Sequence, residues 1–278
     1  MNETAKAAAP GADLGTRFAA AVVMIAIAAV AIWTGGWWFR ALLLAGAAVM
    51  IVEWGDMHRS VRLWSWIGAG LMLLPTLVLP ELLYPAAEDN PAVIDASLFT
   101  QAGIGFAAIL GTGFLYGLVS RRLTLGWGYV YIAVPAFALA VLNWSWAELV
   151  FWPMVVTWST DIFAYFAGRG IGGPKLAPRV SPNKTWAGLI GGMAGAALLG
   201  ALVAWWLGLD PIFYLLGAPL GLLAQLGDLY ESWVKRRAGV KDSGSLLPGH
   251  GGVLDRVDGL LPVALATFLF LVGTLSLS

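Results

Sequence analysis

The sequence predicts an all-α, polytopic integral membrane protein with about nine transmembrane helices. Of its 278 residues, 59% are hydrophobic and only 12% are charged, whereas a soluble domain carries roughly 25% charged residues. Apolar runs of ~20 residues, long enough to cross a bilayer, recur along the chain. A water-facing globule is therefore excluded, and the spans leave no room for a separate extramembrane domain.

We expect one helix in each apolar run. In chain order the ranges are 17–35, 37–54, 64–83, 98–119, 127–146, 148–167, 186–207, 212–230 and 258–276. The first range is an uncleaved anchor, because it is too long for a signal peptide and has no basic leader. The third contains Pro75 and Pro80 and the fourth is interrupted by glycines, so about seven or eight spans are an open alternative.

The placement of charges sets the orientation. All Lys and Arg residues except Arg40 fall in the N-terminal tail or in alternate loops, and the opposite loops hold carboxylates without lysine. The positive-inside rule therefore places the N-terminus in the cytoplasm. The 16 cations balance the 16 carboxylates, so no nucleic-acid partner is predicted. The absence of cysteine excludes disulfides and cysteine-based zinc sites.

Asp161 lies inside the sixth expected span, and an ionisable group within a span indicates function by default. Helical spacing places Asp161, Tyr165 and Gly168 on one face, followed by Arg169. The alternative is an interfacial aspartate that pairs locally with Arg169 or another cation.

Ser181 and Pro182 precede the seventh span, and Ser followed by Pro is typical of a helix N-cap with proline at the first helical position. A helix that starts there directs free N–H groups at the membrane surface, where they bind phosphate. Lys184 and Thr185 add a cation and a hydroxyl. An ordinary helix start with positive-inside cations is an equally good interpretation.

The densest polar stretch runs from 225 to 259. One helix face carries Asp228, Glu231, Ser232 and Lys235, and the next helix carries Asp255 and Asp258 on a shared face. Carboxylates on two adjacent helices with cations between them describe a site for Mg²⁺ and phosphates. The alternative for the cations at 235–237 is a sidedness signal or an anionic-lipid patch.

A glycine-rich loop lies between these two helices. Its glycines allow backbone N–H groups to surround an anion, and they are Gly244, Gly249, Gly251 and Gly252. His250, between two of them, is a candidate general base or a phosphate contact.

At these residues the sequence resembles the phosphatidate cytidylyltransferases, or CDP-diacylglycerol synthases. The C-terminal pattern of the family, S-x-x-K-R, K-D and P-G-H-G-G-x-x-D-R-x-D, is matched by Ser232, Lys235, Arg236, Lys241, Asp242, Pro248, Gly249, His250, Gly251, Gly252, Asp255, Arg256 and Asp258. The earlier pieces of the pattern are Asp161, Ala164, Tyr165, Gly168, Arg169, Ser181, Pro182, Lys184, Thr185, Gly227, Asp228 and Glu231.

The chain departs from the family at one position, where Ala187 replaces the usual glutamate before Gly188. Two interpretations follow: the glutamate is dispensable support, or the chain is a catalytically weakened member. We favour the first, because every other polar position of the pattern is present.

The resemblance implies that CTP and phosphatidic acid give CDP-diacylglycerol and diphosphate, with one or two Mg²⁺ ions, at the cytoplasmic face of a bacterial inner membrane. Membrane lipids are then partners, and a homodimer is expected from the resemblance alone. The implied catalytic residues are Asp228, Lys235, Arg236, Lys241, His250, Asp255 and Asp258. The implied substrate-binding residues are Asp161, Tyr165, Arg169, Ser181, Lys184, Thr185, Ser232, Gly249, Gly251, Gly252 and Arg256. The implied metal ligands are Asp228, Glu231, Asp255 and Asp258, with Asp161 a weaker candidate.

These roles divide the chain into functional regions. We expect a disordered cytoplasmic tail at 1–16, N-terminal transmembrane helices at 17–150, and a C-terminal catalytic region at 151–278 with cytoplasmic loops at 168–185 and 231–257.

Two other classes compete with this interpretation. Helices interrupted by Gly and Pro that carry intramembrane carboxylates also describe an ion-coupled transporter; the crowding of polar residues into the C-terminal half disfavours it. Enzymes that transfer from CDP-diacylglycerol to an alcohol use a D-G-x-x-A-R helix motif, which the sequence lacks.

Overall fold

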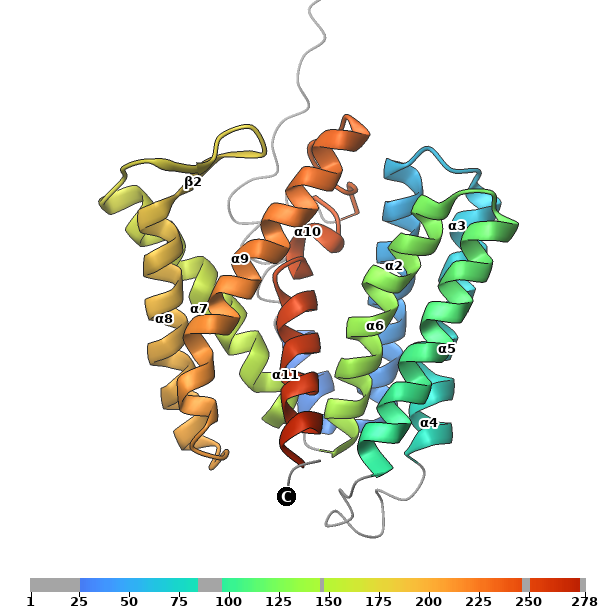
Figure 1. The fold of residues 1–278 in the computed structure, drawn as a ribbon, viewed down its shortest axis with the longest axis horizontal. Coiled ribbons are helices and arrows are strands. Elements are labelled where there is room, and N and C mark those ends of the chain that lie inside the picture. Colours follow the sequence, from blue (N-terminus) through green and yellow to red (C-terminus); the bar gives the residue numbers. More distant parts are fainter. Residues whose placement is uncertain (1–25, 85–96, 146–147, 247–250, 276–278) are drawn as a thin grey trace, which may run out of the picture.

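The structure, a computed structural model, describes residues 26–84, 97–145, 148–246 and 251–275. They form a helical bundle with one small β-hairpin (Figure 1). A helix at 26–34 comes first, and the elements after it are α2 (Gly36–Met57), α3 (Arg62–Leu71), η1 (Leu74–Val78), α4 (Leu79–Leu83), α5 (Ser97–Val119), α6 (Leu123–Ser145), α7 (Glu148–Gly170), β1 (Lys175–Ala177), β2 (Ser181–Thr185), α8 (Trp186–Trp206), α9 (Phe213–Ala238), α10 (Leu254–Val257) and α11 (Leu260–Leu275). The tail predicted at 1–16 lies outside the described residues.

Among the residues that the structure describes, six helical runs are long and apolar enough to cross a membrane: Gly36–Met57, Arg62–Leu83, Phe99–Val119, Leu123–Asn143, Glu148–Gly170 and Trp186–Trp206. The prediction of an all-α membrane protein is confirmed. The count of nine spans and the cytoplasmic N-terminus stay predictions.

The third expected span is a continuous helical run despite its prolines. α3, η1 and α4 follow one another, and η1 is a π-helical turn that begins beside Pro75. Proline has no N–H to donate to the preceding turn, and a local widening to π geometry accommodates that loss. The carbonyl of Leu71, four residues before Pro75, accepts instead from the hydroxyl of Tyr129 at 3.3 Å.

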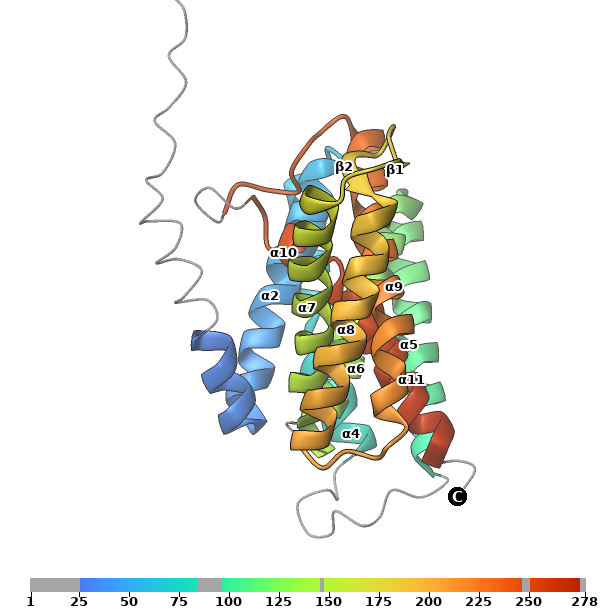
Figure 2. The same cartoon turned by 90° about the vertical axis from the view of Figure 1, so that its left-hand side faces the viewer.

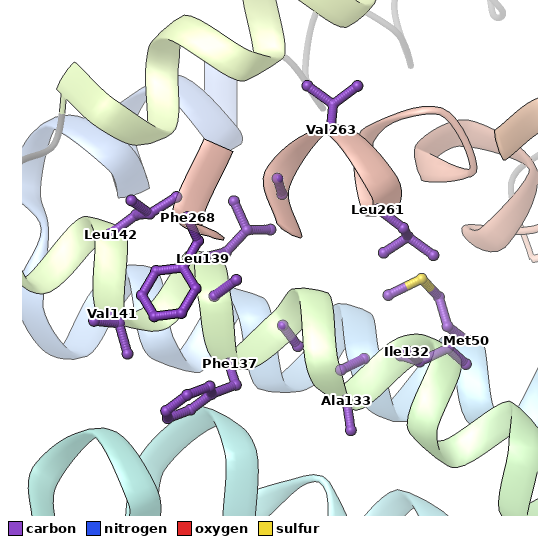
Figure 3. Close-up of a cluster of buried hydrophobic side chains, with 14 of the residues drawn as sticks. Met50, Ile132, Ala133, Phe137, Leu139, Val141, Leu142, Leu261, Val263 and Phe268 are labelled. Carbon is purple, nitrogen blue, oxygen red and sulfur yellow. The ribbon is translucent and has the colours of Figure 1, made fainter. Parts of the chain in front are cut away.

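α6 is the central helix of the bundle, with 78% of its apolar window buried. α2, α5 and α11 surround it, and Figure 3 shows the apolar core that they share. Phe137 of α6 meets Phe106 of α5 and Phe268 of α11 edge to face, with ring centroids 5.8 and 6.2 Å apart. The N-terminal helices are therefore packed around the same core as the last helix of the chain.

Glycines let α7, α8 and α9 approach closely, as the sequence predicts for the seventh span. A Cβ atom on Gly188 would lie 3.0 Å from the carbonyl oxygen of Ala164, and one on Gly192 would lie 2.9 Å from that of Thr160. Small residues at such interfaces allow backbones to meet without a side chain between them. The close packing fixes the ends of α7 and α8, where the polar residues lie.

The connections rich in Lys and Arg gather at one end of the bundle. The α2–α3, α5–α6 and α9–α10 connections and the hairpin all lie there (Figures 1 and 2). Arg40, the exception in the sequence, is buried and pairs with Glu81 at 2.7 Å. We call this end of the bundle, with its four cationic connections, the cationic end.

Candidate active site

α8 begins at Trp186, as the range expected for the seventh span predicts, and not at Ser181 and Pro182. Its N-cap is Thr185, whose hydroxyl accepts a hydrogen bond from the N–H of Gly188 at 3.0 Å. Ser181 and Pro182 lie instead in β2, which pairs antiparallel with β1. The prediction of Ser181 as the N-cap is wrong, because the fixed φ of proline suits an extended edge strand as well as the first turn of a helix.

A cavity of about 640 Å³ lies at the cationic end, between the hairpin and the ends of α7, α8 and α9. The predicted site residues in its lining are Asp161, Tyr165, Arg169, Ser181, Lys184, Thr185 and Asp228. They come from three elements, α7, β2 and α9, and glycine contacts hold α7 against α8, the helix that follows β2. The structure thus brings the intramembrane aspartate, the S-P-x-K-T segment and the start of the C-terminal pattern to one place.

Lys184 links β2 to α9 in this cavity. Its ammonium pairs with Asp228 at 2.7 Å and donates to the carbonyl oxygen of Gln225 at 3.2 Å. Asp228 also accepts from the hydroxyl of Ser232, one turn further along α9, at 3.2 Å. The pair is partly open to solvent, with side-chain exposures of 15% for Lys184 and 34% for Asp228, so a charged ligand that enters the cavity can reach both groups.

A third carboxylate, that of Asp258, lies close enough to Asp161 and Asp228 for their charges to act on it. Asp258 lies in the turn between α10 and α11, outside the membrane-spanning helices. Burial and then the charges of Asp228 and Asp161 raise its pKa. Like charges held together favour a bound cation, and carboxylate oxygens are the donors that Mg²⁺ prefers.

The donor set therefore fits Mg²⁺ in kind. Within the described residues no group of three or more potential ligands is already gathered around one point. Mg²⁺ sites commonly use one or two carboxylates together with substrate phosphates and water, so a complete ligand cage built by the protein alone is not required.

A second cluster surrounds Lys235 on α9. Its ammonium pairs with Glu231 one turn earlier and with Asp255 of α10 at 2.6 Å. The Glu231 side chain is fully buried and that of Asp255 is 5% exposed. Lys235 thereby joins α9 to the short helix α10, and the pairing accounts for the otherwise costly burial of two carboxylates.

Backbone N–H groups of the glycine-rich loop also point at Asp255. Ser243 and Gly252 donate to its carboxylate at 2.9 and 2.7 Å. Burial would raise the pKa of Asp255, but Lys235 and these two N–H groups together hold that pKa below its ordinary value. Two backbone N–H groups of the loop thus bind the chain's own carboxylate; binding of a substrate anion by the loop stays a prediction. Gly251, in the left-handed region at φ +81°, provides the turn that brings the loop to it.

The remaining predicted residues are more peripheral. Arg169 donates to the hydroxyl of Tyr165 at 2.7 Å on the wall of the cavity. Arg236 is exposed and donates to the carbonyl of Val240, and Lys241 and Arg256 are exposed at the cationic end. Gly249 and His250 lie outside the described residues, so their predicted contacts stay predictions.

Glu53 of α2 also belongs to this region, although it lies in none of the sequence motifs. It is 6% exposed and accepts from the N–H groups of Val253 and Leu254. The signal in the sequence was an acidic residue near one end of an apolar span. Its backbone partners lie about 200 residues away in the sequence, and no local pattern connects them.

Comparisons with known proteins find a family model and curated relatives that match most of the chain. The sequence model of the cytidylyltransferase family matches residues 15–273. The chain is 39% identical to a phosphatidate cytidylyltransferase of Brucella abortus biovar 1 (strain 9-941), with 93% of each chain covered. It is 38% identical to one of Rickettsia bellii (strain RML369-C), over 77% of this chain and 95% of the relative. It is 34% identical to one of Synechocystis sp. (strain ATCC 27184 / PCC 6803 / Kazusa), over 92% of this chain and 96% of the relative.

Proposed function

The chain belongs to the cytidylyltransferase family, and from this premise we propose that it is a CTP-dependent phosphatidate cytidylyltransferase. A phosphate oxygen of phosphatidate forms a bond to the α-phosphorus of CTP, and the bond from that phosphorus to the bridging oxygen breaks. The products are CDP-diacylglycerol and diphosphate. The relatives that carry this name cover almost the whole chain.

The observation that carries the proposal is the cavity at the cationic end. It combines carboxylates, cations and hydroxyls on the end of an otherwise apolar bundle. Three further pockets among the described residues are lined almost entirely by apolar side chains. They lack the carboxylates and cations that an ion-coupled transporter places along its path. This distribution of polar and apolar linings supports a reaction on a lipid headgroup at the membrane surface.

Charge repulsion is the main obstacle to this reaction. The phosphate monoester of phosphatidate has a second pKa near ~6 for groups of its kind, so it is already a competent nucleophile at neutral pH. It must nevertheless approach a triphosphate of the same sign, and fixed cations are the usual remedy. Lys184 and Arg169 in the cavity wall supply that charge, and we assign both to phosphate binding.

We assign Mg²⁺ to Asp228 and Asp258, with Asp161 beside them, together with phosphate oxygens of the substrate. A Mg²⁺ ion bound there neutralises charge that develops on the triphosphate. Asp255 and Glu231 were also predicted ligands, but both side chains are buried beside Lys235, at 5% and 0% exposure. Asp228 pairs with Lys184 but is 34% exposed in the cavity. For Asp255 we therefore propose a positioning role: it holds Lys235 and the glycine-rich loop.

The location of the cavity suits a lipid substrate. The acyl chains of phosphatidate remain in the bilayer while its headgroup enters at the end of the helices and CTP arrives from water. The cations at this end support a cytoplasmic orientation by the positive-inside rule, and the bacterial relatives support an inner-membrane location.

The test is product formation by the purified full-length protein in lipid–detergent micelles with labelled CTP, phosphatidate and Mg²⁺. We compare the wild type with Asp228→Asn and, as a matched control, Asp210→Asn. Asp210 lies in the α8–α9 connection, where it accepts from the N–H of Ile212, away from the cavity. We expect CDP-diacylglycerol and diphosphate in equal amounts from the wild type and the control, and a loss of at least about 100-fold in Asp228→Asn.

A folded wild type that binds CTP but forms no product with phosphatidate contradicts the proposal. If Asp228→Asn retains wild-type activity, the proposed reaction stands, but the assignment of the active site to Asp228 is wrong.

A further inference from the structure

Glu53 makes three hydrogen bonds to the segment that carries the C-terminal pattern. Its two carboxylate oxygens accept from the N–H of Val253 at 2.8 Å and from the N–H of Leu254 at 2.9 Å. The hydroxyl of Ser243 donates to the same carboxylate at 3.2 Å. All three donors lie between α9 and the start of α10, whereas Glu53 comes from α2, the other end of the sequence.

The loop is shaped to admit this carboxylate. A Cβ atom on Gly244 would lie 2.8 Å from Glu53 Oε1, and one on Gly252 would lie 2.6 Å from the same atom. Both distances are shorter than ordinary van der Waals contact, so a side chain at either position would displace Glu53. Two of the four glycines in the loop thus have a steric reason to be glycine.

The N–H groups of the segment are shared between two acids of the chain. Ser243 and Gly252 donate from their backbones to Asp255, and Val253 and Leu254 donate to Glu53. Asp255 in turn holds Lys235 at 2.6 Å. A shift of this segment would therefore move Asp255 and, through it, the ammonium of Lys235.

We propose that Glu53 is a positioning residue of α2 that holds Ser243, Val253 and Leu254 and thereby fixes the Asp255–Lys235 pair. It touches no substrate, and its contribution to activity rests on the function proposed above. Through this interaction an N-terminal helix contributes to the cationic end of the protein. In sequence, the N-terminal helices resemble the family only as apolar spans.

The test compares Glu53→Gln with Glu148→Gln, a matched control at an exposed carboxylate in the first turn of α7. The amide of glutamine turns a donor toward one of the two backbone N–H groups and removes the charge. We measure backbone hydrogen exchange of the full-length protein in micelles, the melting temperature, and kcat and KM for CTP.

In Glu53→Gln we expect faster exchange in residues 251–256 but not in α8, and a kcat about tenfold or more below the wild type, as for loss of a charged hydrogen bond. KM for CTP should stay within about twofold, because Glu53 does not line the cavity. Ser243→Ala removes only one of the three contacts and should show the same pattern at roughly fivefold in kcat.

A folded Glu53→Gln protein with wild-type exchange in 251–256 overturns the proposal. So does exchange that rises equally in α8 and α9, since that indicates general loosening of the bundle. If Glu53→Gln does not fold, Ser243→Ala decides by the same criteria. Exchange requires no turnover, so a wild type without cytidylyltransferase activity would refute the proposed function and leave the exchange result to judge Glu53.

Discussion

The role of Asp255 in the structure differs from the role that the sequence predicts. The sequence groups Asp255 with Asp228 and Asp258 as metal ligands, whereas the structure engages both of its oxygens within the protein. Oδ1 accepts from Lys235 at 2.6 Å, and Oδ2 accepts from the N–H groups of Ser243 and Gly252 at 2.9 and 2.7 Å. We therefore expect Asp255→Asn to reduce activity without changing the dependence on Mg²⁺.

The size of the effect follows from these contacts. Asparagine keeps the shape and one acceptor oxygen, but its NH₂ group must face either the ammonium of Lys235 or the backbone N–H groups. Loss of one charge-assisted hydrogen bond at a buried site costs about 1.5–3 kcal/mol. Expressed fully in the transition state, this predicts a kcat/KM roughly 10- to 150-fold below the wild type.

The assay is a Mg²⁺ titration of product formation by the wild type, Asp255→Asn and Asp228→Asn, with melting temperatures measured in parallel. We expect half-maximal activity at the same Mg²⁺ concentration in the wild type and Asp255→Asn, and at a concentration at least about tenfold higher in Asp228→Asn. Recovery of Asp255→Asn activity at saturating Mg²⁺ would refute the reasoning and return Asp255 to the ligand set.

Three further predictions test other parts of the structure. Lys184→Met, which removes the cation that bridges to α9, should raise KM for CTP about tenfold in a protein that melts normally, measured by steady-state kinetics. Gly217→Ala places a Cβ atom 2.8 Å from the Cα atom of Ala197 and should cost about 1–3 kcal/mol of stability, seen as a lower melting temperature; Gly111→Ala, with open space around it, is the matched control and should not lower it. Ala187→Glu restores the family glutamate, and it should change kcat/KM by less than about threefold if that glutamate is dispensable support; a large increase would identify Ala187 as a lesion.

Part of the site could be predicted from the sequence, because some of its residues are charged although the sequence around them is apolar. Asp161 stands out as a carboxylate within a span, and it lines the cavity with Lys184 and Asp228 as expected. Ser181 shows where local pattern fails, since Ser-Pro fits both a helix start and an edge strand. Pairing with Lys175–Ala177 favours the strand over the helix start, and local sequence does not reveal this pairing.

Glu53 shows a different limit. No local spacing connects an acid in α2 to backbone N–H groups of Val253 and Leu254, because hydrogen bonds to the backbone leave no side-chain partner in the sequence. The glycines that make room for it could be read only as flexible. Their second property, the absence of a Cβ atom next to Glu53, depends on the packing of the whole bundle.

The carboxylates of this region therefore serve two physical functions that residue type alone does not separate. Asp255 and Glu53 have their negative charge satisfied inside the protein, by an ammonium or by backbone N–H groups, and such acids stabilise one conformation of the chain. Asp228 also pairs with Lys184, but its side chain is 34% exposed in the cavity. The charges of Asp228 and Asp161 raise the pKa of Asp258, and like charges held together favour a bound cation. Asp255 and Glu53 hold a loop in place, whereas Asp228 and Asp258 are suited to bind a cation. Replacing Asp255 or Glu53 by its amide should therefore loosen the loop. The same change at Asp228 or Asp258 should weaken the binding of Mg²⁺.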